Sequence, residues 1–289
     1  MKLVRMLLVT CACALTGLVG GGLAASAAVA APVEAAYQAT GPWAVSTATV
    51  NDSSGRAIYQ LSYPTDLGRG GVRHPIITWG NGSLATPADY PGLLNHLASW
   101  GFAVVASTSS TTGKGTEILA GAQYLVARAS DPSSIFNGKL DTAHVGAAGH
   151  SQGSGGTINA TTRSGGLITS SAVWALPASI WVSRGDEFDV RALTTPTFFM
   201  GGQWDVLIAG PGVVTDYYRA AGGPAAAAVL KGADHNTIQR TGGGTLGYLA
   251  AWFRYTLSGD TTARSAFAGS TPELLSNTLW QNQAVKSLP

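Results

Sequence analysis

The feature that most constrains the fold of this chain is a regular alternation of short apolar runs with longer segments of helical periodicity. Helical patterns over 90–101, 116–130 and 152–163 separate continuous apolar runs, which are typical of strands buried on both faces. These runs are 75–79, 102–107, 144–149, 170–176, 195–201 and 225–232. Because parallel strands need crossover connections, the alternation predicts an α/β fold: a mostly parallel central sheet with helices on both faces.

The segments outside this alternation predict how the sheet begins and ends. Two alternating stretches, 43–50 and 56–64, are joined by turn residues and predict an antiparallel hairpin at the N-terminal edge. Segment 244–260 predicts an amphipathic helix with core residues at helical spacing, namely Leu246, Leu249, Trp252, Phe253 and Leu257. The tail 270–289 has no clear periodicity, and we expect it to pack as an extension.

Residues 1–30 predict a secretory signal peptide that is cleaved. Lys2 and Arg5 precede the apolar run 6–25, and the small residues of "AASAAVAA" supply an A-x-A cleavage site near Ala30 or Ala31. Cleavage there leaves one domain over 31–289, which is secreted and keeps no stable membrane span. The alternative is an uncleaved anchor, since the apolar run approaches spanning length, but its glycine-rich end and the A-x-A tail favour cleavage.

The cysteines and the charge balance exclude several classes of site and partner. Cys11 and Cys13 both lie in the predicted signal, so the mature domain has no thiol for catalysis or thiolate metal binding. A lipoprotein attached through Cys11 is disfavoured because the apolar run continues beyond it. Without Lys2 and Arg5, the 17 basic residues fall to 15, which equals the 15 acidic residues. No basic stripe is present, and we expect no nucleic-acid partner.

The stretch "GHSQG" at 149–153 fits the motif G-x-S-x-G. A predicted strand leads into it and a predicted helix follows, which is the context of a nucleophile elbow. Such a turn strains the backbone of Ser151 and exposes its hydroxyl above the sheet edge. Gly149 and Gly153 suit the motif because a Cβ there would clash where strand and helix approach closely. Ser151 is therefore the predicted nucleophile.

A serine hydroxyl needs a base, and the base needs an orienting carboxylate. In a chain of this pattern the acid and then the histidine follow the serine. His235 is the only histidine after Ser151, and Asp205 follows a predicted buried strand with room for a strand–helix unit on either side. Four rival aspartates precede that strand, lie in the next predicted helix or adjoin His235: Asp186, Asp189, Asp216 and Asp234.

An oxyanion hole needs two N–H donors at the same edge of the sheet. The first is predicted to be the backbone amide of Gln152, the residue after the nucleophile. The second comes from the loop "WGNGS" after strand 75–79, where Asn81 is favoured and Gly82 is next. Asn81 and Gly82 also read as a tight turn, and both interpretations hold together because a turn aims the amide.

No metal site or cofactor is predicted. The five histidines lie at 74, 96, 144, 150 and 235, without H-x-x-x-H spacing. We expect His150 to pack beside the sheet rather than to act as the base. The stretch "GGGT" at 242–245 precedes a helix but lacks the lysine of a phosphate-binding loop.

Five segments together resemble the α/β-hydrolase family: "PIITWGNGS", "LASWGFAVVAS", "GHSQGSGG", "PTFFMGGQWD" and "AWFRYTLSGD". Within it the chain resembles bacterial secreted polyesterases and cutinases, including polyethylene terephthalate hydrolases, and related chlorophyllase and dienelactone-hydrolase groups. The resemblance implies a single α/β-hydrolase catalytic domain over 31–289. The chain departs from the polyesterases in three ways: "WGNG" replaces a PG-aromatic loop, Gln152 replaces methionine, and the C-terminal disulfide is absent.

The resemblance also implies an aromatic substrate cleft. Trp174 lies in "SSAVWAL", which resembles the segment whose tryptophan lines the cleft, although burial in the core is an equal alternative. Trp79 and Trp204 flank the predicted oxyanion and acid loops and are expected to add aromatic surface.

Together these patterns predict a secreted serine esterase that hydrolyses carboxylic esters, small or polymeric, through an acyl-enzyme. We expect a monomer. An acyltransferase using the same three residues, and a non-catalytic binding protein on this scaffold, are the alternatives.

Overall fold

The computed structural model describes residues 32–289, so the predicted signal and both cysteines lie outside the described residues. The strands are β1 (Val45–Asn51), β2 (Ala57–Pro64), β3 (His74–Gly80), β4 (Ala103–Ser107), β5 (Leu140–His150), β6 (Ser170–Trp174), β7 (Thr197–Gly202), β8 (Ala225–Leu230) and β9 (Trp280–Lys286). The helices are α1 (Pro32–Gln38), α2 (Pro91–Ser99), α3 (Thr116–Ser130), α4 (Gln152–Arg163), α5 (Pro211–Ala220), α6 (Leu246–Ser258) and α7 (Thr261–Arg264).

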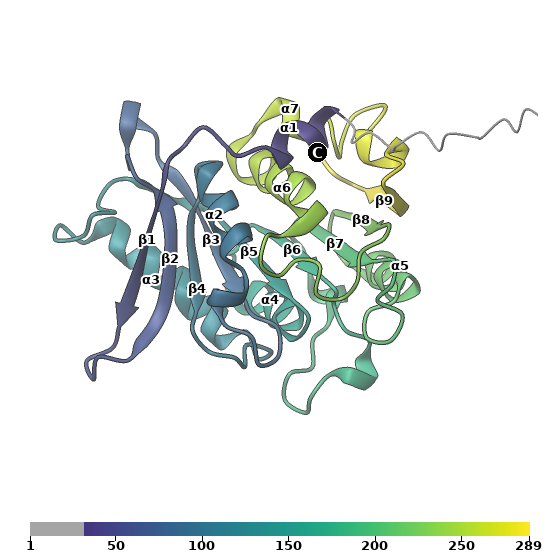
Figure 1. Ribbon diagram of the computed structural model, residues 1–289, viewed down its shortest axis with the longest axis horizontal. Helices are drawn as coiled ribbons and strands as arrows, with labels where there is room; N and C mark the ends of the chain where they lie inside the picture. The colour runs from purple at the N-terminus through teal and green to yellow at the C-terminus, as the bar shows by residue number, and fades with distance from the viewer. Residues whose placement is uncertain (1–31) are drawn as a thin grey trace, which may run out of the picture.

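Within residues 32–289 the strands form one nine-stranded sheet in the order β1-β2-β4-β3-β5-β6-β7-β8-β9 (Figure 1). The six strands from β4 to β8 are parallel to one another. β1 and β2 form the predicted antiparallel hairpin, and β2 continues antiparallel onto β4. The mostly parallel sheet and its N-terminal hairpin are therefore confirmed.

Helices cover both faces of this sheet, as the alternating pattern predicts. α3, α4 and α5 pack on one face, while α2 and α6 pack on the other. Side chains alternate between the two layers along each strand: on β3, Ile76 belongs to the cluster beneath α3, whereas Ile77 and Trp79 belong to the cluster beneath α2 and α6. β3 is buried along its whole length, which explains its unbroken apolar sequence.

The helix predicted as amphipathic over 244–260 is instead buried on nearly all sides. Of its predicted core residues, Leu249, Trp252, Phe253 and Leu257 are buried and Leu246 is partly buried against the core. Tyr248, Ala250, Ala251 and Tyr255 are buried as well. The reason is a third layer, because α1 and α7 pack on α6 from outside, as Figure 1 shows. The sequence pattern could not foresee this covering layer, since it brings together the beginning and the end of the described chain.

The C-terminal tail also differs from the predicted extension. It ends in β9, which pairs antiparallel with β8 and so becomes the far edge of the sheet. The buried carboxylate of Glu34 in α1 accepts hydrogen bonds from Trp280 Nε1 at 2.6 Å and Asn277 Nδ2 at 2.5 Å. α1 is thereby attached to the tail. Of the helices described, none has the length and apolarity that crossing a membrane requires.

Candidate active site

Ser151 occupies a sharp turn between β5 and α4. Its backbone has φ 54° and ψ −122°, a left-handed conformation that a non-glycine residue adopts only under tertiary constraint. The Ser151 amide donates to Trp174 O at 2.9 Å, which attaches the turn to the neighbouring strand β6. A Cβ on Gly149 would clash with Gly153 O, and one on Gly153 would clash with Gly80 O. The glycines of the motif therefore have the steric role that the sequence predicts.

His235 and Asp205 lie beside this serine in a single hydrogen-bonded line. Ser151 Oγ and His235 Nε2 are 2.9 Å apart, and His235 Nδ1 is 2.6 Å from Asp205 Oδ2. Asp205 lies in the loop after β7, and His235 lies in the loop after β8. Because the carboxyl ends of parallel strands share one sheet edge, residues 84 positions apart meet there.

The environment of Asp205 holds the imidazole in one orientation. The carboxylate is buried, and its other oxygen, Oδ1, accepts the backbone N–H groups of Ile208 at 3.3 Å and Ala209 at 3.2 Å. Burial raises the pKa of Asp205, but hydrogen bonding to His235, its charge and the two backbone amides together bring the pKa below its usual range. An ionised Asp205 accepts a hydrogen bond from the Nδ1–H group of His235, which leaves the Nε2 lone pair facing the Ser151 hydroxyl.

The predicted oxyanion donors lie on two neighbouring loops at the same edge. The Gly82 amide is occupied, because it donates to Tyr90 Oη at 3.0 Å. In contrast, the backbone N–H groups of Asn81 and Gln152 have no hydrogen-bond acceptor among residues 32–289. The Asn81 side chain is buried, and its Nδ2 donates to the carbonyls of Ser107 and Ser109 at 2.6 and 2.8 Å. This side chain therefore anchors the loop.

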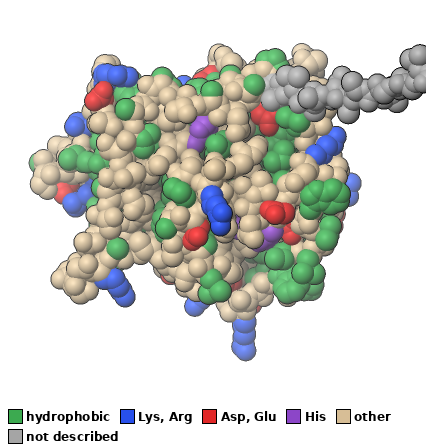
Figure 2. All heavy atoms as spheres, viewed as in Figure 1, with side chains coloured by type: hydrophobic (Ala, Val, Ile, Leu, Met, Phe, Trp, Pro, Cys, Tyr) green, Lys and Arg blue, Asp and Glu red, His purple; other side chains and the backbone are tan. Residues whose placement is uncertain are grey.

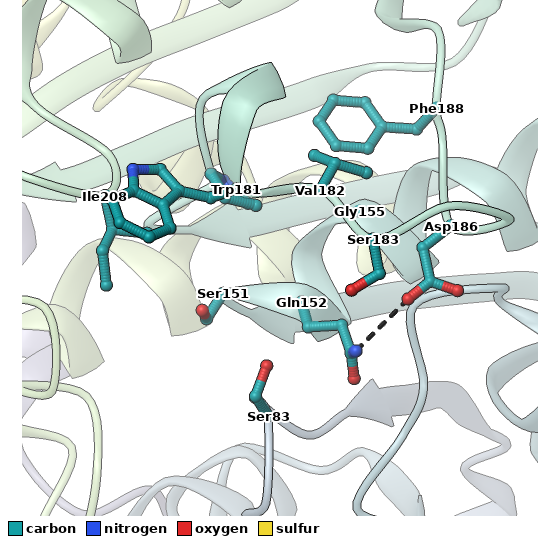
Figure 3. Close-up of a pocket in the computed structure, with 11 residues that line it drawn as sticks. Ser83, Ser151, Gln152, Gly155, Trp181, Val182, Ser183, Asp186, Phe188 and Ile208 are labelled. Atoms are coloured by element: carbon teal, nitrogen blue, oxygen red, sulfur yellow. Dashed lines mark hydrogen bonds between the residues drawn. The ribbon is translucent and has the colours of Figure 1, made fainter.

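A cavity of about 150 Å³ opens beside Ser151 (Figure 3). Trp181 and Ile208 lie along one side, Phe188 and Val182 close another, and the Ser83 hydroxyl faces the Ser151 hydroxyl across the opening. The remaining lining residues are Gln152, Gly155, Pro177, Ser183 and Asp186.

The side chain of Gln152, which replaces the methionine of polyesterases, closes one end of this cavity. Its Nε2 donates to Asp186 Oδ2 at 3.2 Å, and its Oε1 accepts the Thr112 amide at 3.2 Å. Asp186, considered above as a rival acid, thus contacts the residue after the serine rather than His235. The cavity combines aromatic walls with this polar end.

The three tryptophans expected in the substrate cleft do not line this cavity. Trp174 and Trp79 are fully buried in the core beneath α2 and α6, and Trp204 is exposed in the acid loop. Trp174 is therefore a core residue, as the alternative interpretation predicts. Because helices cover both faces of β6, a side chain on either face of this strand is buried, and that of Trp174 packs beneath α2 and α6. Its Nε1 donates to His235 O at 3.0 Å, so it supports the histidine loop from below.

Trp181 lines the cavity instead, and sequence analysis missed it. It ends the short 3-10 helix η3 (Ser179–Trp181), in the loop that follows β6. Its Nε1 donates to Leu207 O at 2.8 Å, which ties it to the acid loop. The available signal was its position: an aromatic residue in a loop after a buried parallel strand lies at the edge where sites form. Ser83, two residues after Asn81, likewise lies in a loop that follows a buried parallel strand.

Across residues 32–289 no group of three or more His, Cys, Asp and Glu side chains is arranged to hold a metal ion. The charged side chains visible on the face in Figure 2 are scattered, with hydrophobic side chains gathered toward the right-hand edge.

A serine at a strained strand-to-helix turn, on a mostly parallel sheet with helices on both faces, defines an α/β-hydrolase fold. The chain matches the model of the PET hydrolase-like family over residues 24–284 and therefore belongs to that family. It is 29% identical over 188 residues to the bis(hydroxyethyl) terephthalate hydrolase of Streptomyces coelicolor. The match covers 61% of this chain and 55% of that protein, so the chain spans about half the length of this curated relative. Family membership supports a carboxylic-ester hydrolase.

Proposed function

We propose that this protein is a secreted serine esterase that hydrolyses carboxylic esters through an acyl-enzyme. The observation that carries the proposal is the continuous line of hydrogen bonds from Asp205 through His235 to Ser151, with the serine held at the elbow. The proposal includes one catalytic domain from about residue 31, which acts as a monomer.

In the proposed reaction His235 Nε2 takes the proton of Ser151 as Oγ attacks the ester carbonyl carbon. The tetrahedral intermediate collapses, the carbon–oxygen bond to the alcohol breaks, and His235 returns its proton to the departing alcohol. Water then attacks the acyl-enzyme with His235 as base, which releases the acid and restores the serine. Asp205 keeps the imidazole in the reactive tautomer and stabilises the imidazolium.

The proposed oxyanion donors are the backbone amides of Asn81 and Gln152. Their support is that neither amide has an acceptor among the described residues, whereas that of Gly82 does. The Gln152 amide is also at the N-terminus of α4, where the helix dipole favours negative charge.

The proposed substrates are neutral esters with a small apolar or aromatic acyl group. A cavity of about 150 Å³ has room for a single ring, and Trp181 and Phe188 offer flat apolar contact. The three loops that contribute Ser83, Trp181 and Ile208 to the cavity also carry exposed apolar side chains, namely Leu84, Ile180, Trp204, Val206 and Leu207. Such loops suit an ester that presents an apolar surface. Bis(hydroxyethyl) terephthalate, the ester that appears in the name of the Streptomyces relative, combines these properties.

The decisive experiment compares the wild-type protein with the Ser151→Ala variant on p-nitrophenyl butyrate and bis(hydroxyethyl) terephthalate. We expect turnover to fall by about 10³-fold or more in a folded variant, because the nucleophile is lost. A fluorophosphonate probe should label the wild type and leave the variant unlabelled. Turnover near the wild-type level in Ser151→Ala would refute the proposal. Product analysis with an added alcohol separates hydrolysis from acyl transfer.

A further inference from the structure

His150, the residue before the nucleophile, is a buried histidine with two hydrogen-bond partners outside the Ser–His–Asp line. Its Nδ1 is 2.9 Å from Tyr90 Oη, and its Nε2 is 3.0 Å from His235 O. Tyr90 Oη in turn accepts the Gly82 amide at 3.0 Å. A single chain of hydrogen bonds thus runs from the oxyanion loop, through the residue beside Ser151, to the backbone of His235.

The groups at the two ends of this chain of hydrogen bonds determine which atom donates and which accepts in each bond. A backbone carbonyl only accepts, so His150 Nε2 must carry the proton that binds His235 O. Burial, and then the nearby charge of His235, lower the pKa of His150 to about 3, so its ring is neutral and Nδ1 is an acceptor. Tyr90 must therefore donate its hydroxyl proton to Nδ1, which leaves its oxygen free to accept from Gly82.

The packing around the chain leaves little freedom for either loop. A Cβ on Gly82 would lie 2.9 Å from His150 Nδ1 and 3.2 Å from Tyr90 Oη, so the oxyanion loop rests directly on both side chains. Trp79 packs edge-on against Tyr90, with ring centroids 4.9 Å apart. His235 O accepts from both His150 and Trp174, which holds the backbone of the histidine loop at two points.

We propose that His150 and Tyr90 are positioning residues that hold the oxyanion loop and the His235 loop in a fixed relation to Ser151. The proposal rests on the proposed esterase function. By binding the Gly82 amide, Tyr90 sets the orientation of the loop that carries the Asn81 amide. By binding His235 O, His150 sets the height of the base above the elbow. Neither side chain exchanges a proton with substrate.

The test compares His150→Phe, which removes both hydrogen bonds, with His150→Gln, whose amide N–H can still reach His235 O. We expect kcat to fall by about 100-fold in His150→Phe with KM within about threefold, because misplacement of the base affects the reacting step. His150→Gln should recover most of this loss. Tyr90→Phe should lower kcat by about tenfold.

The matched control is His96→Phe. His96 is also buried, its Nε2 also bonds a backbone carbonyl, that of Tyr37 at 2.8 Å, and burial likewise lowers its pKa. Both Phe variants should lose thermal stability, but only His150→Phe should lose kcat. The rate of fluorophosphonate labelling of Ser151 should fall in parallel with kcat, because it needs the same base and oxyanion donors.

The double variant Tyr90→Phe/His150→Phe should be no slower than His150→Phe alone, because both side chains belong to one chain of hydrogen bonds. A kcat for His150→Phe within twofold of the wild type, or an equal loss in His96→Phe, would overturn the positioning role. If the wild type itself shows no esterase activity, or Ser151→Ala retains it, the proposed function fails instead.

Discussion

The hydrogen bonds around Asp205 make the outcome of Asp205→Asn predictable from geometry. Oδ1 accepts two backbone N–H groups, from Ile208 and Ala209, while Oδ2 accepts His235 Nδ1 at 2.6 Å. An asparagine must keep its carbonyl oxygen toward the two backbone donors, so its NH₂ group faces Nδ1. Nδ1 then has to accept, the imidazole proton moves to Nε2, and the base toward Ser151 is lost.

The opposite orientation of that asparagine would preserve the reactive tautomer, but it leaves two backbone N–H groups unpaired, the buried one of Ala209 and the partly buried one of Ile208. Each unpaired group costs about 1–3 kcal/mol, so the reactive orientation is disfavoured by about 2–6 kcal/mol. At about 1.4 kcal/mol per decade, this corresponds to a reactive fraction between about 1 in 30 and 1 in 10⁴. We therefore expect kcat/KM on p-nitrophenyl butyrate at pH 7 to fall by about 30-fold at least.

The control for this variant is Asp216→Asn, which removes a carboxylate that is 76% exposed on α5. We expect its kcat/KM to equal that of the wild type. Circular dichroism and thermal melting would show that both variants are folded. Activity of folded Asp205→Asn above one tenth of the wild-type value would refute the assignment of Asp205 as the orienting acid and reopen the case for its rivals.

Three further predictions concern packing, the cavity and pH. Gly153→Ala should lower stability by about 3 kcal/mol through clashes with rigid backbone, whereas Gly212→Ala, with open space around it, should change a urea melt by less than about 1 kcal/mol. Trp181→Ala should raise KM for aromatic esters about tenfold. Trp43→Ala should change KM little in the same steady-state assay, because Trp43 packs against His74 at the end of β3 away from the cavity. The pKa of His150 is lowered to about 3 in the folded protein, so between about pH 3 and pH 6.5 its imidazole binds a proton in the unfolded chain but not in the folded one. The contribution of His150 to stability is therefore complete above about pH 6.5 and is lost as the pH falls toward 3. The melting temperature of His150→Gln should depend less on pH over this range than that of the wild type. Equal stability of Gly153→Ala and Gly212→Ala would contradict the packing argument, and equal KM for the two tryptophan variants would contradict the role of Trp181. The argument about pH would be contradicted if the melting temperatures of the wild type and His150→Gln changed in parallel with pH.

The positions of Ser151, Asp205 and His235 at one sheet edge could be anticipated from the sequence for a physical reason. Each follows a run of buried strand residues, and parallel strands present all their carboxyl ends on the same side. The order of strands and helices along the chain therefore determines that loops far apart in sequence converge. The hairpin and the two helical layers could also be predicted, because hydrophobic periodicity is visible within short segments of the sequence.

The occupants of the cleft could not be predicted in this way. Trp174 and Trp181 are seven positions apart and equally aromatic, but one lies in the core and the other lines the cavity. The difference depends on which face of β6 the α6 layer covers and on where the next loop folds back to meet Leu207. Neither the face that α6 covers nor the path of this loop can be predicted from the amino-acid composition.

The sequence by itself therefore determined the parallel strands, the N-terminal hairpin, the elbow and the candidate nucleophile, base and acid, because these depend on periodicity and on chain order. Only the tertiary structure decided which amides stay free, which tryptophan meets the cavity, and that His150 links the oxyanion loop to His235. Those properties arise from contacts between segments tens of residues apart, which bring together the donors and acceptors that can pair. Which partner an amide or an imidazole takes is settled only when the surrounding chain has packed.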